Sequence, residues 1–322
     1  MIGLAALANA LRGSRGLAAK ADIAAITTQL GLTATAVAVG DDCAAIPDGD
    51  EFLLFAIEGF MNEFVAADPW FAGWCGVMVN ISDVAAMGGR ALAVVDAIWS
   101  AGETGAAEVL AGMRAAAQAF GVPIVGGHTN IRNQHGQLAV AILGRAANLL
   151  TSFAAKPGEK LIAAIDLRGR YREPFSNWEA ATTAPPARLR GDLEILPRIA
   201  ELGLSHAAKD ISQAGIIGTA AMLAECSQIA INIDITAIPR PENVTLERWL
   251  LSFPSYGYLL AAEPENTAAI LAMFHARGIA AAEIGSLSAG AEVCITDGTK
   301  REIIWDFAIN PLIGCAPAGA AA

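Results

Sequence analysis

Short segments of apolar and β-branched residues recur in the first half of the chain, and over residues 33–39 they alternate, a pattern typical of β-strands. On this basis we predict strands over residues 33–39, 52–57, 91–98, 122–125 and 138–144. Two longer segments have the spacing of helices. One begins with the N-cap pair Asp68-Pro69 and ends at Met87, and the other begins at Thr104. The first half therefore has a mixed α/β pattern.

The pattern changes near residue 148, where we place a domain boundary. Strands are predicted in the second half over residues 160–165, 229–233, 256–262 and 291–296, and helices over 193–202, 212–226 and 266–277. We therefore expect an α/β domain over residues 1–148 and an α+β domain over residues 149–322. The Ala-Gly tail after about residue 315 is expected to be disordered.

Composition narrows the class of protein. The chain has 322 residues, of which 54% are hydrophobic, so it can bury a large core. Its most apolar segments are interrupted before they reach the roughly 18 residues that a membrane span needs, so no membrane partner is expected. The five cysteines lie far apart and their number is odd, which indicates reduced thiols. The N-terminus does not have the pattern of a secretory signal, so we expect a cytoplasmic protein.

The net charge of −11 argues against a nucleic-acid partner, because nucleic-acid phosphates would be repelled. An acidic protein that binds a nucleotide would need metal ions between its carboxylates and the phosphates. Adjacent carboxylates occur at Gly40-Asp41-Asp42, where the first predicted strand ends, and they repel each other unless a cation lies beside them. A solvated turn is the alternative interpretation.

Four residues of the predicted helix over 68–87 lie on one stripe, namely Gly73, Gly76, Asn80 and Asp83. The glycines would allow another group to approach closely, and Asp83 would offer oxygen to a hard cation such as Mg²⁺. Tight helix packing on the glycines with Asp83 exposed is the alternative interpretation.

The predicted strand 122–125 leads into Gly126-Gly127-His128-Thr129, which we interpret as a glycine loop whose N–H groups can bind phosphate. His128 can ligate a metal, contact phosphate or cap the turn. Asp210 and Ser212 precede a predicted helix, where either is a natural N-cap. Arginines at 168, 170, 172, 188 and 190 can hold an anionic substrate or form a solvated basic face.

The order of these motifs resembles the aminoimidazole ribonucleotide (AIR) synthetase-related superfamily. That superfamily includes thiamine-monophosphate kinase, selenophosphate synthetase and the hydrogenase maturation dehydratase. The resemblance extends from about Gly40 to Gly285, and its most specific element runs from Asn80 to Gly89. It is nearest to the AIR synthase-related branch whose members lack an assigned activity. The resemblance implies a homodimer in which the N-terminal sheets of two subunits share a β-barrel, flanked by C-terminal α+β domains.

The resemblance also implies ATP and Mg²⁺ at the N-terminal acids. Its implied metal ligands are Asp41, Asp42, Glu58 and Asp83, and its implied nucleotide contacts are Gly40, Asp41, Asn80, Ser82, Gly126, Gly127, His128 and Thr129. We assign catalytic roles to Asp42, to Asp210 and to Lys20, which we place in a mobile N-terminal segment. The chain departs from the family at Ala56-Ile57, where relatives have threonines, and at Ser255-Tyr256, where thiamine-monophosphate kinase relatives carry acids.

The sequence thus predicts an ATP-dependent, Mg²⁺-requiring phosphotransferase or synthetase-like enzyme that acts on a small anionic metabolite and releases ADP. Three alternatives stay open. The activity can resemble that of thiamine-monophosphate kinase or of selenophosphate synthetase, whose histidine matches His128. The chain can be a nucleotide-binding regulatory homodimer with reduced turnover. A non-nucleotide enzyme with His128 as a metal ligand is the third.

Overall fold

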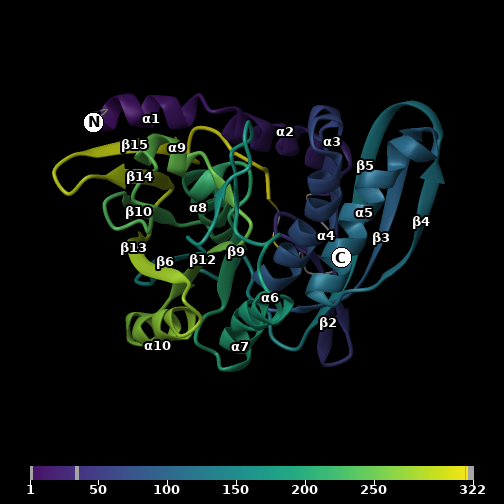
Figure 1. The fold of residues 1–322 in the computed structure, drawn as a ribbon. Helices are drawn as coiled ribbons and strands as arrows, with labels where there is room; N and C mark the ends of the chain where they lie inside the picture. Colours follow the sequence, from purple (N-terminus) through teal and green to yellow (C-terminus); the bar gives the residue numbers. More distant parts are fainter. Residues whose placement is uncertain (1–2, 33–35, 316, 318–322) are drawn as a thin grey trace. The chain divides into compact units, whose positions relative to one another are not determined.

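A computed structural model describes residues 3–32, 36–315 and 317 of the chain (Figure 1). The described chain forms two compact units. Unit 1 comprises Met1–Asp41, Leu149–Ala180 and Ile199–Ala322, and unit 2 comprises Asp42–Asn148 and Ala181–Arg198. The chain passes from unit 2 to unit 1 between Asn148 and Leu149, and both units are discontinuous in sequence. The predicted roles of residues 1–148 in binding ATP and in dimerisation stay predictions.

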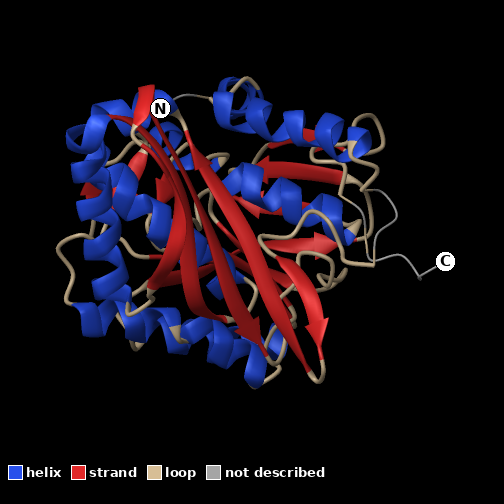
Figure 2. Cartoon of the chain, turned by 90° about the vertical axis from the view of Figure 1, so that its right-hand side faces the viewer, coloured by secondary structure: helices blue, strands red, loops and turns tan. Residues whose placement is uncertain are grey.

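A five-stranded mixed sheet forms the frame of unit 2. Its strands, in spatial order, are β1 (Ala44–Asp48), β2 (Glu51–Phe60), β5 (Arg132–Ala146), β3 (Arg90–Ala101) and β4 (Ile124–Asn130). Neighbouring strands are antiparallel except β3 and β4, which are parallel because a helix connects them. Figure 2 shows the long strands in red.

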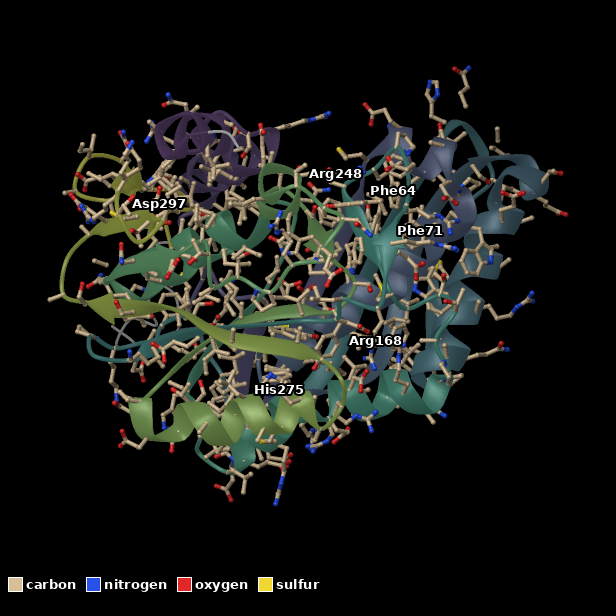
Figure 3. All side chains as sticks on the ribbon, turned by 60° about the vertical axis from the view of Figure 1, so that its left-hand side comes forward. Phe64, Phe71, Arg168, Arg248, His275 and Asp297 are labelled. Atoms are coloured by element: carbon tan, nitrogen blue, oxygen red, sulfur yellow. The ribbon has the colours of Figure 1, made fainter. Side chains whose placement is uncertain are left out.

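The helices assigned wholly or partly to unit 2 are α3 (Asn62–Ala67), α4 (Pro69–Ala86), α5 (Gly102–Phe120), α6 (Pro186–Leu193) and α7 (Ile195–Glu201), whose last residues belong to unit 1. Helix α4 begins as predicted, because Asp68 accepts a hydrogen bond from the Phe71 N–H at 3.3 Å. The Phe64 and Phe71 rings meet edge to face at 5.9 Å (Figure 3).

Glycines let α4 approach its neighbours closely. A Cβ atom on Gly73 would lie 2.0 Å from the Val109 carbonyl oxygen of α5, and one on Gly76 would lie 2.8 Å from Val140 of β5. In the reverse direction, a Cβ atom on Gly112 of α5 would lie 1.8 Å from the Trp70 carbonyl oxygen. The glycine stripe therefore packs against α5 and the sheet, which confirms the helix-packing interpretation for Gly73 and Gly76.

Unit 1 contains a seven-stranded mixed sheet and a small three-stranded one. The larger sheet has the order β15 (Arg301–Asp306), β14 (Glu292–Thr296), β10 (Ala230–Asp234), β13 (Ala280–Ser288), β6 (Lys160–Ile165), β12 (Gly257–Ala262) and β9 (Ala207–Asp210). The smaller has the order β11 (Phe253–Pro254), β8 (Asn177–Glu179) and β7 (Arg170–Tyr171). Its helices include α1 (Leu4–Arg12), α2 (Arg15–Gln29), α8 (Gly215–Ser227), α9 (Leu246–Leu250) and α10 (Pro264–His275).

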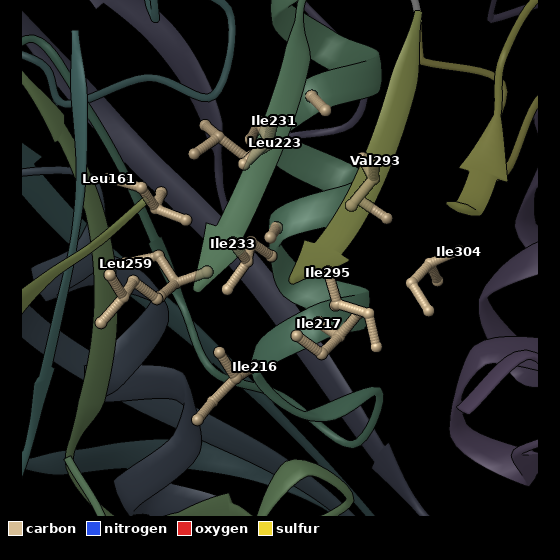
Figure 4. Packing of buried hydrophobic residues seen from close by; sticks show 14 of the residues in the cluster. Leu161, Ile216, Ile217, Leu223, Ile231, Ile233, Leu259, Val293, Ile295 and Ile304 are labelled. Carbon is tan, nitrogen blue, oxygen red and sulfur yellow. The ribbon is translucent and has the colours of Figure 1, made fainter. Parts of the chain in front are cut away.

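The core of unit 1 forms where α8 packs against the larger sheet (Figure 4). Ile217 and Leu223 of α8 lie beside Ile233 and Ile295 of the sheet, and all four side chains are buried. Each such side chain contributes roughly 1.5–3 kcal/mol through the hydrophobic effect. The apolar sequence of α8 is explained by this position, since almost its whole length is buried.

Several predicted elements differ from the structure. Residues 36–38 are not in a strand and Val39 makes a single bridge, while residues 33–35 of that predicted strand lie outside the described residues. Helices α1 and α2 and strands β9, β13 and β15 are found where no element was predicted. The predicted disorder after residue 315 falls almost wholly outside the described residues. Within the described chain, no helix is long and apolar enough to cross a membrane.

Candidate functional site

Two carboxylates meet in unit 2. Asp42 lies just before β1, and Asp83 lies near the end of α4 with only 6% of its surface exposed. Oxygen atoms of the two groups are within 4.8 Å of each other. Two negative charges this close repel, and a divalent cation between or beside them removes that repulsion. The predicted combination of Asp42 with Asp83 is thus present in the structure, whereas their metal-binding role stays a prediction.

Asn80 adds an oxygen atom on the same side of α4, because it precedes Asp83 by three residues. Its side chain is completely buried, and Nδ2 donates to the Gly76 carbonyl at 2.8 Å. Its Oδ1 accepts no hydrogen bond from any residue that the structure describes. An unsatisfied buried amide oxygen costs about 1–3 kcal/mol, so this atom is suited to a ligand. Ser82, also a predicted nucleotide contact, lies two residues after Asn80 and is half-buried.

Asp41 belongs to unit 1 and has different neighbours. Its carboxylate accepts hydrogen bonds from the Thr151 hydroxyl and, at 2.7 Å, from the Ser152 N–H. Burial raises the pKa of Asp41 above its usual value, although the positive charge of Lys209 and these hydrogen bonds lower it. Lys209 also donates to the Gly40 carbonyl at 3.3 Å. These contacts anchor the Gly40-Asp41 turn, and the predicted metal and nucleotide roles of both residues stay predictions.

Glu58 lies in β2, exposed, on the face of the sheet that α4 covers. Phe60 and Leu54, at alternate positions with Glu58, show this: a Cβ atom on Gly76 of α4 would lie 3.8 Å from Phe60, and one on Gly89, just after α4, would lie 2.3 Å from Leu54. The neighbouring Ile57 points to the opposite face. The role of Glu58 as a metal ligand stays a prediction.

The predicted glycine loop at residues 126–130 is wrong. These residues are the greater part of strand β4, in which Gly127 pairs with Asp96 and His128 with Ala97 of β3. Parallel pairing with β3 therefore outweighs the low strand propensity of glycine. His128 lies 5.9 Å from the Trp99 ring, so it shares the face of Ala97 rather than that of Asp96. The predicted nucleotide contacts Gly126, Gly127, His128 and Thr129 are thus strand residues, and their binding roles stay predictions.

Asp210 and Lys20 belong to unit 1. Asp210 ends β9 and pairs with Tyr258 of β12, whereas α8 begins later, with Ala214 as its N-cap and no side-chain cap. The predicted capping of that helix by Asp210 or Ser212 is therefore wrong. Lys20 lies within α2, so the segment that was expected to be mobile is helical. The catalytic roles of Asp210 and Lys20 stay predictions.

The predicted arginine cluster is divided between the two units. Arg168 (Figure 3) makes a 2.7 Å ion pair with the buried Asp166 and donates to the Arg277 carbonyl, so its described contacts are structural. Arg188 and Arg190 lie in α6 of unit 2, where Arg188 is 3.9 Å from Asp192. Arg170 and Arg172 stay with unit 1.

The buried Lys209 was missed as a structural residue. The sequence did contain a signal for it, because Lys209 lies between Ala208 and Asp210 at the end of an apolar segment. A lysine that is buried there needs a partner for its charge. Its partner Asp41 is far away in sequence, so the pair could be found only from the fold.

Family models match both halves of the chain. The N-terminal domain of AIR synthase related protein matches residues 40–146, and the C-terminal domain of AIR synthase related protein matches residues 176–297. The chain belongs to the AIR synthase-related superfamily. This confirms the resemblance predicted from the order of the motifs. A protein of Synechocystis sp. described as uncharacterised is 46% identical over 281 residues, covering 87% of each chain.

Other relatives of this AIR synthase-related protein have named activities. Thiamine-monophosphate kinase of Halobacterium salinarum is 28% identical over 206 residues, which cover 62% of this chain and 69% of the kinase. Phosphoribosylformylglycinamidine synthase subunit PurL of Methanosarcina barkeri is 24% identical over 86% of this chain and 42% of its own length. Superfamily members therefore include ATP-dependent kinases and synthetases.

Solved structures share the fold. T. maritima PurL complexed with ADP has a TM-score of 0.75 at 18% identity, covering 96% of this chain and 53% of PurL. AaThiL complexed with AMPPCP and TMP has a TM-score of 0.65 at 19% identity, covering 87% of this chain and 94% of AaThiL. The predicted mixed α/β fold of AIR synthase type is thus confirmed, and the dimeric β-barrel stays a prediction.

Proposed function

We propose that this AIR synthase-related protein is an ATP-dependent, Mg²⁺-requiring phosphotransferase or synthetase-like enzyme that acts on a small anionic substrate and releases ADP. The observation that carries the proposal is the pairing of Asp42 with Asp83 within 4.8 Å in unit 2. The named relatives and the nucleotides in the related structures support it. A cytoplasmic location, no nucleic-acid partner and a homodimeric state are part of the same proposal.

The donor set fits a hard divalent cation. Asp42 and Asp83 provide carboxylate oxygens, and Asn80 has a buried amide oxygen that accepts no hydrogen bond from the described residues. Mg²⁺ prefers one or two carboxylates and leaves its remaining positions to water and phosphate. When bound, Mg²⁺ would neutralise charge on the ATP phosphates and help to place them in line with an acceptor. The protein's part is to hold the Asn80 and Asp83 oxygens on α4, with the Asp42 carboxylate close to that of Asp83.

Asp83→Asn tests the proposal. Removing one of two adjacent carboxylates relieves their repulsion, so without ligand the variant should be as stable as the wild type or more stable by about 1 kcal/mol. It should lose the rise in melting temperature that Mg²⁺ and ATP give the wild type, a rise that corresponds to about 2.7 kcal/mol when the ligand is at 100 times its Kd. ADP release should stop as well.

Asp48→Asn is the matched control. Asp48 is an exposed acid of unit 2 that pairs with Arg145 at 3.2 Å, so its replacement should change stability by less than about 1 kcal/mol and leave Mg-ATP stabilisation intact. If Asp83→Asn responds to Mg-ATP as strongly as the wild type does, the assignment of Asp83 is wrong.

The molecules bound in related structures suggest which substrates to test first. The related structures contain FGAR in T. maritima PurL and TMP in AaThiL, so both belong in a first panel of acceptors together with selenide. ADP release with one of them would select among a kinase resembling thiamine-monophosphate kinase, a synthetase resembling PurL and one resembling selenophosphate synthetase. Mg-ATP binding without ADP release across the panel would favour the regulatory homodimer.

The homodimer is supported by an apolar face of the unit 2 sheet. Phe55 and Leu143 pair across β2 and β5, and Ile57 and Val95 both pair with Ala141, so these side chains share one face. Their exposed fractions are 50% for Phe55, 38% for Leu143, 65% for Ile57 and 40% for Val95. Contiguous exposed apolar side chains mark interaction surfaces. We propose that a second copy of the chain covers this face.

A further inference from the structure

Two cysteines of unit 1 meet at the Gly40 turn. Cys226 lies in the last turn of α8, and Cys315 follows the last strand near the end of the described chain. A hydrogen bond with Cys315, together with burial, raises the pKa of the Cys226 thiol well above its usual value. A Cβ atom on Gly40 would lie 2.6 Å from the Cβ of Cys315 and 3.0 Å from the Sγ of Cys226. Both cysteines therefore pack closely against Gly40, where a side chain would not fit.

The segment before Cys315 is fixed to the helix that carries Cys226. The carboxylate of Glu225 accepts hydrogen bonds from three successive backbone N–H groups, those of Leu312 at 3.0 Å, Ile313 at 2.7 Å and Gly314 at 3.1 Å. Leu312 and Ile313 are also buried. Charge-assisted hydrogen bonds of this kind are strong, so the approach of Cys315 to Cys226 is built into the fold.

Buried thiols often serve only as small apolar side chains, and Cys43, Cys75 and Cys294 are buried. The Cys226–Cys315 pair includes the one cysteine that is not buried. Cys315 is partly exposed, whereas Cys226 and the other three cysteines are buried. A small oxidant can therefore reach Cys315, and the neighbouring Cys226 thiol can then form a disulfide with it.

We propose that Cys226 and Cys315 form a reversible disulfide site that fastens the C-terminal segment to α8 beside the Gly40 turn. The oxidant is a low-molecular-weight disulfide, for which oxidised glutathione is the probe. The Cys315 thiolate attacks one of its sulfurs and releases one glutathione thiolate. The Cys226 thiol then loses its proton to solvent and attacks the Cys315 sulfur, which releases the second glutathione. The protein loses two hydrogens and two electrons, and the small disulfide becomes two thiols.

The disulfide would change the Gly40 turn. In the reduced protein the Cys226 thiol donates to the Gly40 carbonyl at 3.6 Å, and Lys209 donates to the same oxygen. Oxidation removes the thiol donor and closes a covalent loop of about 90 residues, which should raise the melting temperature by about 5–10 °C. This inference does not depend on ATP binding, since it concerns a covalent change within unit 1.

The test treats the full-length protein with oxidised glutathione, alkylates remaining thiols and maps the peptides by mass spectrometry. The expected result is a mass lower by about 2 Da, one cross-linked peptide pair containing Cys226 and Cys315, the rise in melting temperature, and reversal of all three by dithiothreitol. Cys315→Ser should abolish the cross-link and the rise in melting temperature.

Cys294→Ser is the matched control, since Cys294 is a buried thiol of the same unit that contacts Glu292 instead of a second cysteine. This variant should still form the cross-link. The proposal is overturned by a persistent glutathione adduct on Cys315 or by full alkylation of both thiols after oxidation. A rise in melting temperature that survives in Cys315→Ser would also overturn it.

Discussion

At the level of single residues, the charge of the buried Lys209 offsets part of the cost of burying the Asp41 carboxylate. Lys209 is 3% exposed, and its ammonium group lowers the pKa of Asp41 while burial raises it. The net pKa of Asp41 is above 3.8, so ionising this carboxyl costs more in the folded chain than in the unfolded one. Its contribution to stability is therefore greatest below pH 3.8 and is lost as the pH rises through the folded pKa.

Lys209→Met should remove the compensating charge and leave Asp41 buried beside an apolar side chain. We expect a loss of about 3–5 kcal/mol at pH 7, because breaking one partner of a buried pair leaves the other uncompensated. The loss should shrink towards pH 5, because the pKa of Asp41 rises further in the variant and protonation then removes its charge. Urea unfolding of both proteins at the two pH values measures this.

Lys160→Met provides the comparison, because Lys160 pairs with Glu283 at 2.7 Å in a more exposed setting. That variant should lose no more than about 1 kcal/mol at either pH. An equal and pH-independent loss in the two variants would mean that Lys209 acts only through packing.

Residue types and local spacing predicted part of the candidate site. Asp83 and Asn80 were found because they lie three residues apart on one predicted helix, and a helix fixes that geometry. Asp42 was found because it adjoins another acid. Asp41 has the same local signal as Asp42, yet its contacts are with Thr151 and Lys209. Such partners are set by the fold over long sequence separations, so local pattern could not separate the two acids.

At the level of elements, the crossing of α4 and α5 depends on glycine at specific positions. Gly112→Ala should destabilise unit 2 by about 1–3 kcal/mol, because the new methyl group would lie 1.8 Å from the Trp70 carbonyl oxygen and the helices would have to separate. Gly105→Ala in the same helix meets only the Ser100 Cβ atom, at 3.5 Å, and should be neutral or stabilising by up to about 1 kcal/mol. Thermal unfolding of the two variants gives the comparison, and equal stability would contradict this account of the crossing.

Elements with a strong local signal were predicted well and others were not. Helix α4 has an N-cap, a proline at its first position and glycines after its end, so its bounds were predicted closely. Residues 126–130 of strand β4 include two glycines and were taken for a loop, because their extended form depends on pairing with β3. Pairing of this kind comes from residues that are distant in sequence, which a local pattern does not contain.

At the level of the whole molecule, unit 1 takes residues from both ends of the chain and from its middle. Arg12 of α1 donates to the Ile303 carbonyl of β15, so the first helix and the last strand are in contact. A sequence pattern indicates elements one after another and does not indicate that the first 41 residues join the last 124. The pattern therefore has a signal near residue 148 but none for the discontinuity of the units.

Assembly is the last property at this scale, and Ile57→Glu tests it. Ile57 is 65% exposed on the apolar face of the unit 2 sheet, so a charge there should not disturb the folded monomer, but burying it unpaired in a dimer would cost several kcal/mol. We expect the wild type to have the mass of a dimer in light scattering and Ile57→Glu to have the mass of a monomer. Ile309→Glu is the matched control, since Ile309 is 73% exposed in unit 1, and it should stay dimeric. A wild type that is monomeric at high concentration would show that another partner covers the face. A dimer that persists in Ile57→Glu would place the interface on another surface.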